Sequence, residues 1–528
     1  MRAHTRIHSF RFALVLALVV AGRPAFALHE ESPPVTRVTG VDNHYMSPGR
    51  TWGNWLTFSS TQDLALLGAN RAAGRQIFIW NEGYFDCFNG TTKTCAPNVP
   101  PESCQNTPCP PADIQAKYLR QLTNGVGDPD NPSLAIPPQL STCDGTPTGT
   151  VCSAGNQAQL CPDKLCKDVP QWFLEDRQWV AFDALGAFNG NIGGAATRRQ
   201  IFLKNVGTGE IRQVTFSSTG DSVRPSIAER GGSVVFQSTA SLDGFPNPTG
   251  AMQVYLYQRN NGVIRRISKG LPPINTIGLG PSTNPHPTTS GNGIVFQSTA
   301  DLLGDGHDTG ISQVWFAKYD RQNSVVTALL KVTNGNADSI NPFIGDAQTP
   351  PGQVGEAKKI VFESTATDLP GTLQVPGRSI YEIGIDVSNA VLDPAIVQVT
   401  PPAIFGDCMW PSIDASGKRI PMVCTGDPLL NGTVGNRLFV LDRQQNVLYQ
   451  ITGAGDVQGT PQSNLGQWFV AFATTSDLTG AGVCGYQIYI IDYTIGKWGA
   501  VTQLGQLPPD ALGQSPQGVA RTRGALVG

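Results

Sequence analysis

One short sequence pattern recurs along most of this chain, and it limits the possible folds more than any other feature. The pattern is a pair of apolar residues ending in an aromatic residue, followed by small hydroxyl residues and often by Asp-Leu. Its aromatic anchors are Phe58, Phe182, Phe236, Phe296, Phe362 and Phe472, and Met422-Val423-Cys424 is the most degenerate copy, with Cys424 taken as its anchor. The steps from Phe182 to Phe362 are 54, 60 and 66 residues. Such a period indicates an array of supersecondary units.

Two further landmarks follow each anchor in a fixed order. The first is usually Gln, then a β-branched residue, then an aromatic residue, as in Gln76-Ile77-Phe78, Gln200-Ile201-Phe202, Gln253-Val254-Tyr255, Gln313-Val314-Trp315 and Gln487-Ile488-Tyr489. The second is a short strand ending in Thr or Ser, as in Val214-Thr215 and Ile267-Ser268. A proline-marked segment precedes the anchors, clearest in Arg224-Pro225-Ser226-Ile227 and Trp410-Pro411-Ser412-Ile413. Each unit therefore contains four short strands.

An isolated four-stranded sheet of this kind cannot bury both of its apolar faces. Stacking the copies around an axis buries them and leaves only short edges exposed. The sequence therefore predicts an all-β fold, a β-propeller of about seven four-stranded blades, with six or eight as alternatives. The chain holds 59 glycines and 40 prolines with only 15% charged residues, a composition typical of many strands joined by tight turns.

One interval in the array is much longer than the others. Phe58 and Phe182 are 124 residues apart, and eight of the 11 cysteines lie between them. They form two groups, Cys87, Cys95, Cys104 and Cys109, then Cys143, Cys152, Cys161 and Cys166. Neither group contains a Cys-x-x-Cys pair, which favours disulfides over a structural zinc site. We interpret the groups as two disulfide-rich loop insertions, at about residues 84–117 and 137–170, before and after the last strand of the first unit.

Ring closure has two candidate strands in the sequence. Residues 35–39 look like an eighth copy of the closing strand placed ahead of the first unit, and residues 500–503 would close the seventh unit from its own end. One of the two is surplus. We expect the propeller to occupy residues 28–504 and residues 505–528 to form a disordered tail.

The N-terminus reads as a secretory signal over residues 1–27. Arg2, Arg6 and Arg11 precede a short apolar stretch, and Ala25-Phe26-Ala27 gives the small-x-small pattern that signal peptidase needs. There is no cysteine near this site, so a lipid anchor is not expected. We predict a secreted or periplasmic protein with no membrane span once the signal is removed, which agrees with its cysteine content.

The remaining chain is slightly acidic, which bears on its partners. Removing residues 1–27 leaves 33 basic and 40 acidic residues, a formal charge of −7. Binding to nucleic acid needs a clustered basic surface, and none is visible in the sequence. We therefore expect no nucleic-acid partner.

The repeat unit resembles that of the TolB-like propellers, which are related to WD-type repeats. The matching features are the Pro-Ser-Ile lead-in, the Val-Val-Phe-x-Ser-Thr strand and the Gln-Val-Tyr strand, and they are strongest over residues 223–302. The resemblance covers about residues 35–503 and implies an interaction scaffold outside the cytoplasm. The cysteine-rich insertions depart from the pattern of that family. Such repeats are specific for fold and nearly silent on function.

Few residues suggest local chemistry. Asp301, Asp305 and Asp308 lie in a glycine-rich loop and are a candidate Ca²⁺ site, because carboxylate oxygens are the ligands that Ca²⁺ prefers. The alternative is that Asp301 caps a turn, as its counterparts in other units would. His29, His44, His286 and His307 form no catalytic motif, and no catalytic or cofactor-binding residue is predicted. No cofactor is required by the sequence.

Three cysteines lie outside the insertions. Cys408 and Cys424 are equidistant from Ser416, so a hairpin centred there would place them opposite one another, close enough for a disulfide. The alternative is a pair of buried thiols. Cys484 is the odd cysteine that remains. The alternatives for it are a disulfide with an insertion cysteine, a disulfide with another chain, or a free thiol.

These observations favour an exported scaffold that binds an envelope or extracellular protein, or another ligand, through its loops. Nothing in the sequence requires an enzyme. The alternative is a propeller hydrolase, such as a Ca²⁺-dependent lactonase or a glycosidase, with catalytic groups from several blades at the central channel. A structural surface-layer component is a third, weaker option.

Overall fold

The computed structural model describes the strands near the N-terminus and most of residues 119–492. The described residues are 27–30, 36–37, 43–48, 55–61, 74–81, 119–135, 179–188 and 196–492, apart from gaps at 207, 229–230, 248, 273–279, 305–309, 346–356, 370–376, 401–405, 415–416, 427, 429–434, 444–446, 454–455, 464–468 and 475–486. Within the described residues, no helix has both the length and the apolar character needed to cross a bilayer.

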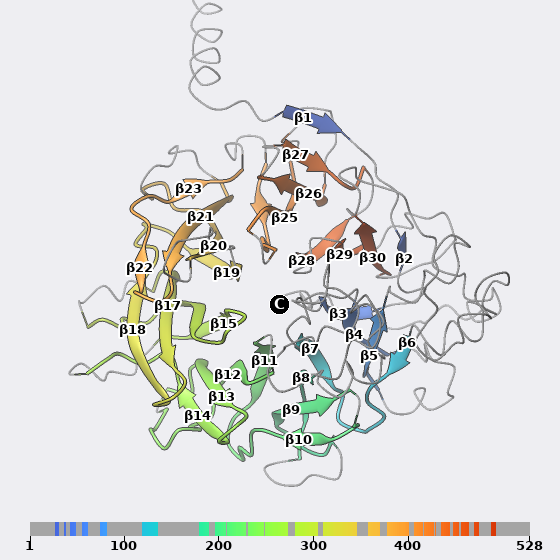
Figure 1. Ribbon diagram of the computed structural model, residues 1–528, viewed down its shortest axis with the longest axis vertical. Helices are drawn as coiled ribbons and strands as arrows, with labels where there is room; N and C mark the ends of the chain where they lie inside the picture. The colour runs from blue at the N-terminus through green and yellow to red at the C-terminus, as the bar shows by residue number, and fades with distance from the viewer. Residues whose placement is uncertain are drawn as a thin grey trace, which may run out of the picture.

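Seven small sheets are arranged around a central axis, which confirms the predicted β-propeller (Figure 1). Blade 1 contains β3 (Asn43–Pro48), β4 (Trp55–Ser60), β5 (Gln76–Asn81) and β6 (Leu119–Gln121), and blade 2 contains β7 (Asp130–Ala135), β8 (Trp179–Leu185), β9 (Arg199–Asn205) and β10 (Ile211–Gln213). Blade 3 contains β11 (Ser222–Ile227), β12 (Ser233–Ser238), β13 (Gln253–Gln258) and β14 (Val263–Arg266), and blade 4 contains β15 (Ser282–Pro287), β16 (Gly293–Ser298), β17 (Gln313–Asp320) and β18 (Val325–Lys331).

The remaining three blades follow in chain order. Blade 5 contains β19 (Ser339–Gly345), β20 (Ala357–Ser364), β21 (Ser379–Asp386), β22 (Val391–Leu392) and β23 (Val397–Gln398). Blade 6 contains β24 (Cys408–Met409), β25 (Arg419–Cys424), β26 (Arg437–Asp442) and β27 (Val447–Gln450), and blade 7 contains β28 (Val457–Ser463), β29 (Phe469–Thr474) and β30 (Gln487–Asp492). The first strands of six blades, β3, β7, β11, β15, β19 and β28, lie nearest the axis in Figure 1, and β24 is the corresponding end strand of the blade 6 sheet.

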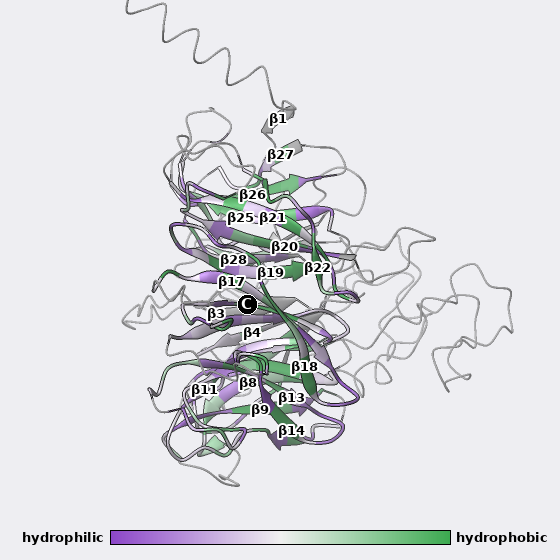
Figure 2. Ribbon diagram, turned by 90° about the vertical axis from the view of Figure 1, so that its left-hand side faces the viewer, coloured by the Kyte–Doolittle hydropathy of each residue, from purple (hydrophilic) through white to green (hydrophobic). Residues whose placement is uncertain are grey.

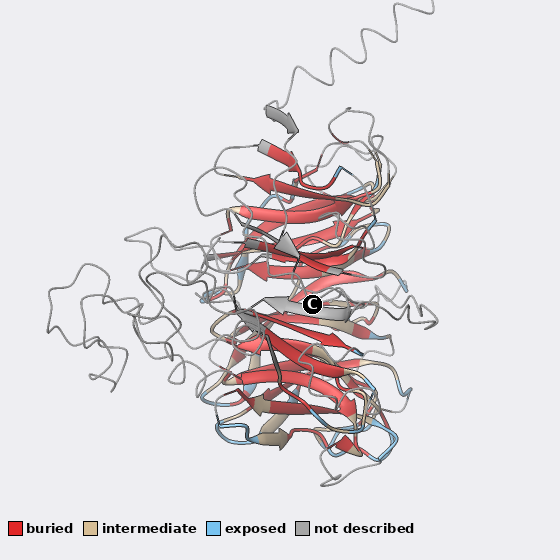
Figure 3. Ribbon diagram, turned by 90° about the vertical axis from the view of Figure 1, so that its right-hand side faces the viewer, coloured by how far each residue is buried: buried red, intermediate tan, exposed pale blue. Residues whose placement is uncertain are grey.

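The hydrophobic core lies between neighbouring blades. Each apolar cluster draws residues from two consecutive sheets, such as Ile77 of blade 1 with Val180 of blade 2, and Leu256 of blade 3 with Trp315 of blade 4. Most strand residues are buried along their length (Figure 3). Burying one large apolar side chain contributes about 1.5–3 kcal/mol, so face-to-face stacking of blades is the main source of stability.

The aromatic anchors hold the same position in each blade. Phe58, Phe182, Phe236 and Phe362 have no exposed surface. Each of them stacks on the aromatic residue directly opposite on the third strand, with ring centroids 5.7–5.9 Å apart and interplanar angles of 15–23°. The anchors are therefore core residues between the blades, as their spacing predicts.

The anchor of blade 6 was predicted wrongly. Met422 lies opposite Phe439, as Phe236 lies opposite Tyr255, so Met422 and not Cys424 occupies the anchor position. Cys424 lies opposite Arg437, which is the place that Ser238 has opposite Gln253. Cysteine is apolar enough to pass for an anchor in the sequence, and the cross-strand register removes the ambiguity.

The N-terminal segment adds strands to the last two blades. β2 (Thr36–Arg37) pairs antiparallel with β30 and forms the outermost strand of blade 7. β1 (Ala27–Glu30) pairs in parallel with β27 as a fifth strand of blade 6. Of the two predicted closing strands, the N-terminal one completes the ring, and residues 500–503 lie outside the described residues.

Both predicted insertions begin and end on one face of the ring. The first joins β5 to β6, and the second joins β7 to β8 and therefore lies within blade 2. Each strand in these blades is antiparallel to its neighbours. The first and third strands therefore end on the face of the ring where the second and fourth strands begin. We call this the insertion face. The insertions and their eight cysteines lie outside the described residues, as do residues 1–26 and 505–528.

Candidate functional site

Polar residues gather on the innermost strands, at a backbone feature that five blades share. In each of these blades a left-handed residue lies in the innermost strand, or directly after it in blade 6, and just before a proline: Asn131, Arg224, Asn284, Asn341 and Trp410, with φ of 50–53°. Positive φ is unfavourable for residues other than glycine, and asparagine tolerates it best. The residue lies where the register between the first and second strands shifts in blades 2–5. A feature that costs free energy and recurs in the same place has a common structural purpose.

That purpose is a hydrogen bond to the preceding blade. The backbone N–H of the left-handed residue donates to a side chain on the second strand of the blade before it. Arg224 donates to Asp183 (2.9 Å), Asn284 to Gln237 (3.0 Å), Asn341 to Gln297 (2.7 Å) and Trp410 to Glu363 (2.6 Å). We call these four bonds the axial latches. They bridge consecutive blades from blade 2 to blade 6.

Side chains of the left-handed residues join the latches into a continuous network. Asn131 donates to Asp183, Asn284 to Gln297 and Asn341 to Glu363, each within one blade. Along the ring, the Arg224 guanidinium donates to Asn284 Oδ1 (3.1 Å), and the Asn284 side-chain amide donates to Asn341 Oδ1 (2.9 Å). The amides are thus shared between their own blade and the next one, which fixes the angle between blades.

The acceptor is charged only where an arginine accompanies it. In blades 2 and 5 the acceptors are Asp183 and Glu363. Each acid pairs with an arginine near the start of the third strand, Arg199 before Gln200 and Arg378 before Ser379. Arg199 bonds to Asp183 through Nε, and Arg378 lies 3.2 Å from Glu363. In blades 3 and 4 the acceptors are Gln237 and Gln297, and the matching positions hold Met252 and Ser312. The acceptor and the residue near the start of the third strand therefore vary together: an acid occurs with arginine, and glutamine occurs with an uncharged residue.

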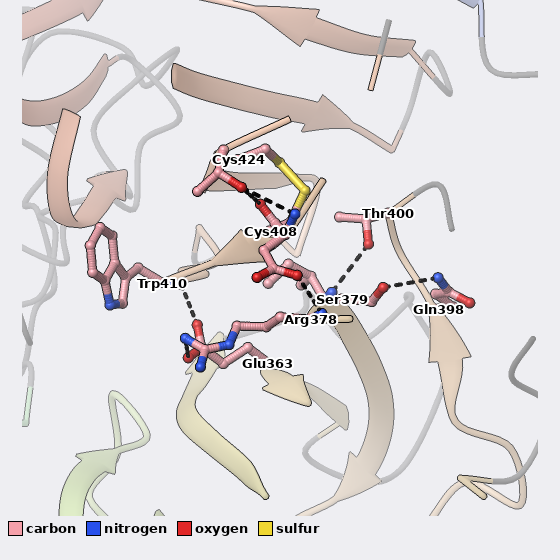
Figure 4. The surroundings of a disulfide bond; sticks show 11 residues. Glu363, Arg378, Ser379, Gln398, Thr400, Cys408, Trp410 and Cys424 are labelled. Carbon is pink, nitrogen blue, oxygen red and sulfur yellow. Dashed lines mark hydrogen bonds and ion pairs between the residues drawn. A yellow bond between two sulfur atoms is a disulfide. The ribbon is translucent and has the colours of Figure 1, made fainter. Parts of the chain in front are cut away.

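Both acids have raised pKa values because they are buried. Desolvation raises the pKa of Asp183 above its ordinary value, and the neighbouring Arg199 opposes this effect. Desolvation raises the pKa of Glu363 from 4.5 to about 7, against the hydrogen bond from the Trp410 backbone and the charge of Arg378. Figure 4 shows Trp410, which directly follows β24, and Arg378, which directly precedes β21, converging on Glu363.

We expect Glu363→Gln to remove a pH dependence of stability. With a folded-state pKa of about 7 against 4.5 unfolded, Glu363 favours folding below pH 4.5, and this contribution is lost as the pH rises to about 7. The difference corresponds to about 3 kcal/mol. Gln297 already accepts two such hydrogen bonds through one oxygen, so glutamine fits this position. Denaturant unfolding should show equal stability for the two proteins near pH 4.5 and a more stable variant near pH 8. An offset that is the same at both pH values would contradict the raised pKa.

The disulfide of blade 6 replaces a hydroxyl pair found in other blades. Cys408 and Cys424 are bonded, and both are buried. They lie opposite one another in the register, as predicted. The same cross-strand position holds Ser222 with Ser238, Ser282 with Ser298, and Ser339 with Ser364, whose hydroxyls are 2.8–2.9 Å apart. All four pairs tie the innermost strand of a blade to its second strand.

The other predicted site residues are only partly described. Asp301 Oδ1 accepts a hydrogen bond from the backbone N–H of Gly304 (2.7 Å). This is the turn cap that the sequence offered as the alternative to a Ca²⁺ ligand. Asp305, Asp308 and Cys484 lie outside the described residues, so the Ca²⁺ site stays a prediction. Within the described part of the chain, no group of three or more potential metal ligands occurs. His286 is buried, with its ring 4.0 Å from that of Phe343 on the next blade.

The axial network could have been found in the sequence only in part. Proline marks the innermost strands, and asparagine precedes it in three blades, which is a signal for left-handed backbone. The acceptors have no common residue type, since they are Asp, Gln, Gln and Glu, so no motif records them. Their hydrogen bonds hold blades to one another, and this arrangement makes the ring a rigid support for its loops.

The sequence matches no family model and no curated protein. Similar solved structures include TolB from Acinetobacter baumannii, at 14% identity over 55% of this chain and 59% of that one, with a TM-score of 0.32. An oligogalacturonate lyase in complex with manganese is 14% identical over 88% of this chain and 95% of that one, with a TM-score of 0.42. A prolyl endopeptidase structure is 11% identical over 88% of this chain and 49% of that one, with a TM-score of 0.43. The seven sheets make this chain a β-propeller, and its structural neighbours include a TolB protein.

Proposed function

We propose that the chain is an exported propeller scaffold that binds an envelope or extracellular protein through its insertion face. The observation that carries this proposal is the position of the two insertions. Both start and finish on the same face, on adjacent blades: at Asn81 and Leu119 in blade 1, and at Ala135 and Trp179 in blade 2. β7 packs against β3 and β4, so the two sites are neighbours in the ring.

The rest of the insertion face supports this assignment by contrast. At the equivalent places, other blades have short hairpins, such as residues 206–210 in blade 2, 259–262 in blade 3 and 321–324 in blade 4. Long loops on a rigid support commonly carry recognition. Eight cysteines in the two insertions would limit the conformations of otherwise irregular loops. Together they would form one surface that the repeats alone do not provide.

The test replaces each insertion with a loop that the chain already uses. Residues 82–118 are exchanged for residues 259–262, and residues 136–178 for residues 228–232, which join the corresponding strands of blade 3. The full mature chain and both variants are crosslinked in the native cell envelope, and captured proteins are identified by mass spectrometry. We expect one reproducible partner with the full chain, lost in both variants, which should retain the thermal unfolding of a folded ring.

A partner that both folded variants retain would contradict the proposal. An unchanged set of background proteins in all three samples would also count against it. In that case, the hydrolase alternative would be examined with substrates and metals. The buried acids Asp183 and Glu363 give that alternative no specific support, because their described hydrogen bonds connect blades.

A further inference from the structure

Two arginines on the insertion face have no acidic partner among the described residues. Arg259 directly follows β13 in blade 3, and Arg321 directly follows β17 in blade 4, so both lie where a third strand ends. Both side chains are half-buried. Their guanidinium groups donate to backbone carbonyls of the described residues, Arg259 to Gly231 (2.8 Å) and Arg321 to Ser290 (3.0 Å). No ion pair within the described part of the chain neutralises either charge.

A glycine turn between β11 and β12 holds the two arginines in place. A Cβ atom on Gly231 would lie 3.2 Å from the side chain of Trp179 in blade 2, and one on Gly232 would lie 2.6 Å from Nη2 of Arg321. A larger residue at either position would therefore displace one of these side chains. Arg259 lies on the blade 2 side of the turn, with its guanidinium 4.6 Å from the centre of the Trp179 ring. Arg321 reaches the turn from the blade 4 side.

The arginine pair adjoins the second insertion. Trp179 is the first residue of β8, the strand that follows this insertion. Figure 2 shows the ring from its edge, with hydrophobic colour concentrated in the strands and hydrophilic colour in the loops at the two faces. The stacking on Trp179 and the hydrogen bond to Gly231 fix the Arg259 side chain, while its two Nη atoms have no hydrogen-bond partner among the described residues. A donor ordered in advance loses less entropy on binding.

The surroundings of Arg259 are positively charged as well. Burial lowers the pKa of Arg259 below its ordinary value, and the charge of Arg212 lowers it further, against smaller opposing effects of Tyr257 and Glu210. Arg212 pairs with Glu210 (2.9 Å), but both side chains are exposed, and such pairs are screened by solvent. Arg259 still carries its charge at neutral pH. A negative group brought by a partner would therefore relieve repulsion at this position.

We propose that Arg259 and Arg321 bind an acidic segment of the protein partner, with carboxylate side chains on the two sides of the glycine turn. This inference rests on the proposed function, because it assigns a chemistry to the partner that the insertion face binds. A guanidinium group is planar and donates parallel hydrogen bonds to a carboxylate. Two such groups on opposite sides of one turn fit neighbouring carboxylates of a peptide chain better than one small anion.

Fluorescence anisotropy of a labelled oligo-glutamate peptide with residues 28–528 tests this contact. We expect binding that weakens as NaCl is added, because salt screens exposed charges. Arg259→Gln and Arg321→Gln should each weaken binding about tenfold, as expected for the loss of one charge-assisted hydrogen bond. Arg198→Gln is the matched control, since Arg198 pairs with Asp221 (3.5 Å) just before β9, on the opposite face. It should bind the peptide like the wild type, and all variants should retain the thermal unfolding of a folded ring.

A wild type that does not bind the peptide at low salt would overturn the inference, as would binding that Arg259→Gln combined with Arg321→Gln retains. Preferential binding to phosphatidylglycerol vesicles or to inorganic phosphate, lost in the same combined variant, would assign the arginines to a phosphate group instead.

The envelope capture experiment separates this inference from the scaffold proposal. The combined variant should lose the partner that the full chain captures. A partner that is lost when the insertions are exchanged, but retained by the combined variant, would overturn the acidic contact and leave the scaffold proposal in place. A partner that the insertion-exchange variants retain would contradict the scaffold proposal, even if the arginines bind the peptide.

Discussion

Asp183→Ala is expected to lower the free energy of unfolding by about 3–5 kcal/mol, the usual cost of removing one partner of a buried ion pair. Asp183 has a fully buried side chain. It accepts hydrogen bonds from Asn131, Arg199 and Arg224, which belong to blades 2 and 3. Alanine would leave the Arg199 guanidinium without its main partner and would release the axial latch between these blades. Denaturant unfolding of residues 28–528 would measure the loss.

The chain offers a matched control for this substitution. Gln237→Ala removes the neutral acceptor at the same place in blade 3, where the latch comes from Asn284, and should cost only about 1–3 kcal/mol. Asp183→Gln combined with Arg199→Met recreates the pair that blade 3 uses, Gln237 with Met252, and should recover most of the stability. Equal losses for Asp183→Ala and Gln237→Ala would contradict the role of the buried charge.

Replacing both cysteines of blade 6 is the second change with a large expected effect. Cys408→Ser with Cys424→Ser should lower the free energy of unfolding by about 2–4 kcal/mol, because the disulfide closes a loop in the unfolded chain and so reduces its conformational entropy. The two residues are 16 positions apart. The serine pair can still form the hydroxyl contact seen in blades 3, 4 and 5. Cys408→Ala with Cys424→Ala cannot, and should lose about 1 kcal/mol more.

The corresponding change in blade 4 separates the two contributions. Ser282→Ala with Ser298→Ala removes a hydroxyl pair without touching a disulfide, and should cost about 1 kcal/mol. Thermal or denaturant unfolding without reductant would compare all four proteins. A serine pair at residues 408 and 424 that is as stable as the disulfide would show that the crosslink adds nothing to the hydrogen bond.

The sequence predicted the ring because its core pattern repeats. Phe236, Phe296 and Phe362 recur with the same neighbours, and such periodicity follows directly from burial between blades. The prediction of the blade 6 anchor was wrong because Met422 and Cys424 are both apolar and only two positions apart. Cross-strand register decides between them, and a single sequence does not contain it.

The axial network was not predicted, for a different physical reason. Each latch is a backbone N–H bonded to a side chain of another blade, more than 40 positions away for Arg224 and Asp183. Only the left-handed position has a local signal, an asparagine before proline.

Site-specific photo-crosslinking tests the central claim, that this ring is a scaffold whose insertion face binds the partner. A photoreactive residue would replace Thr208, exposed in the hairpin of blade 2 on the insertion face, or Phe216, which is 52% exposed on the loop leaving the same blade at the opposite face. We predict a covalent adduct with one envelope or extracellular protein from position 208 and none from position 216. An adduct with the partner from position 216 alone would contradict the account.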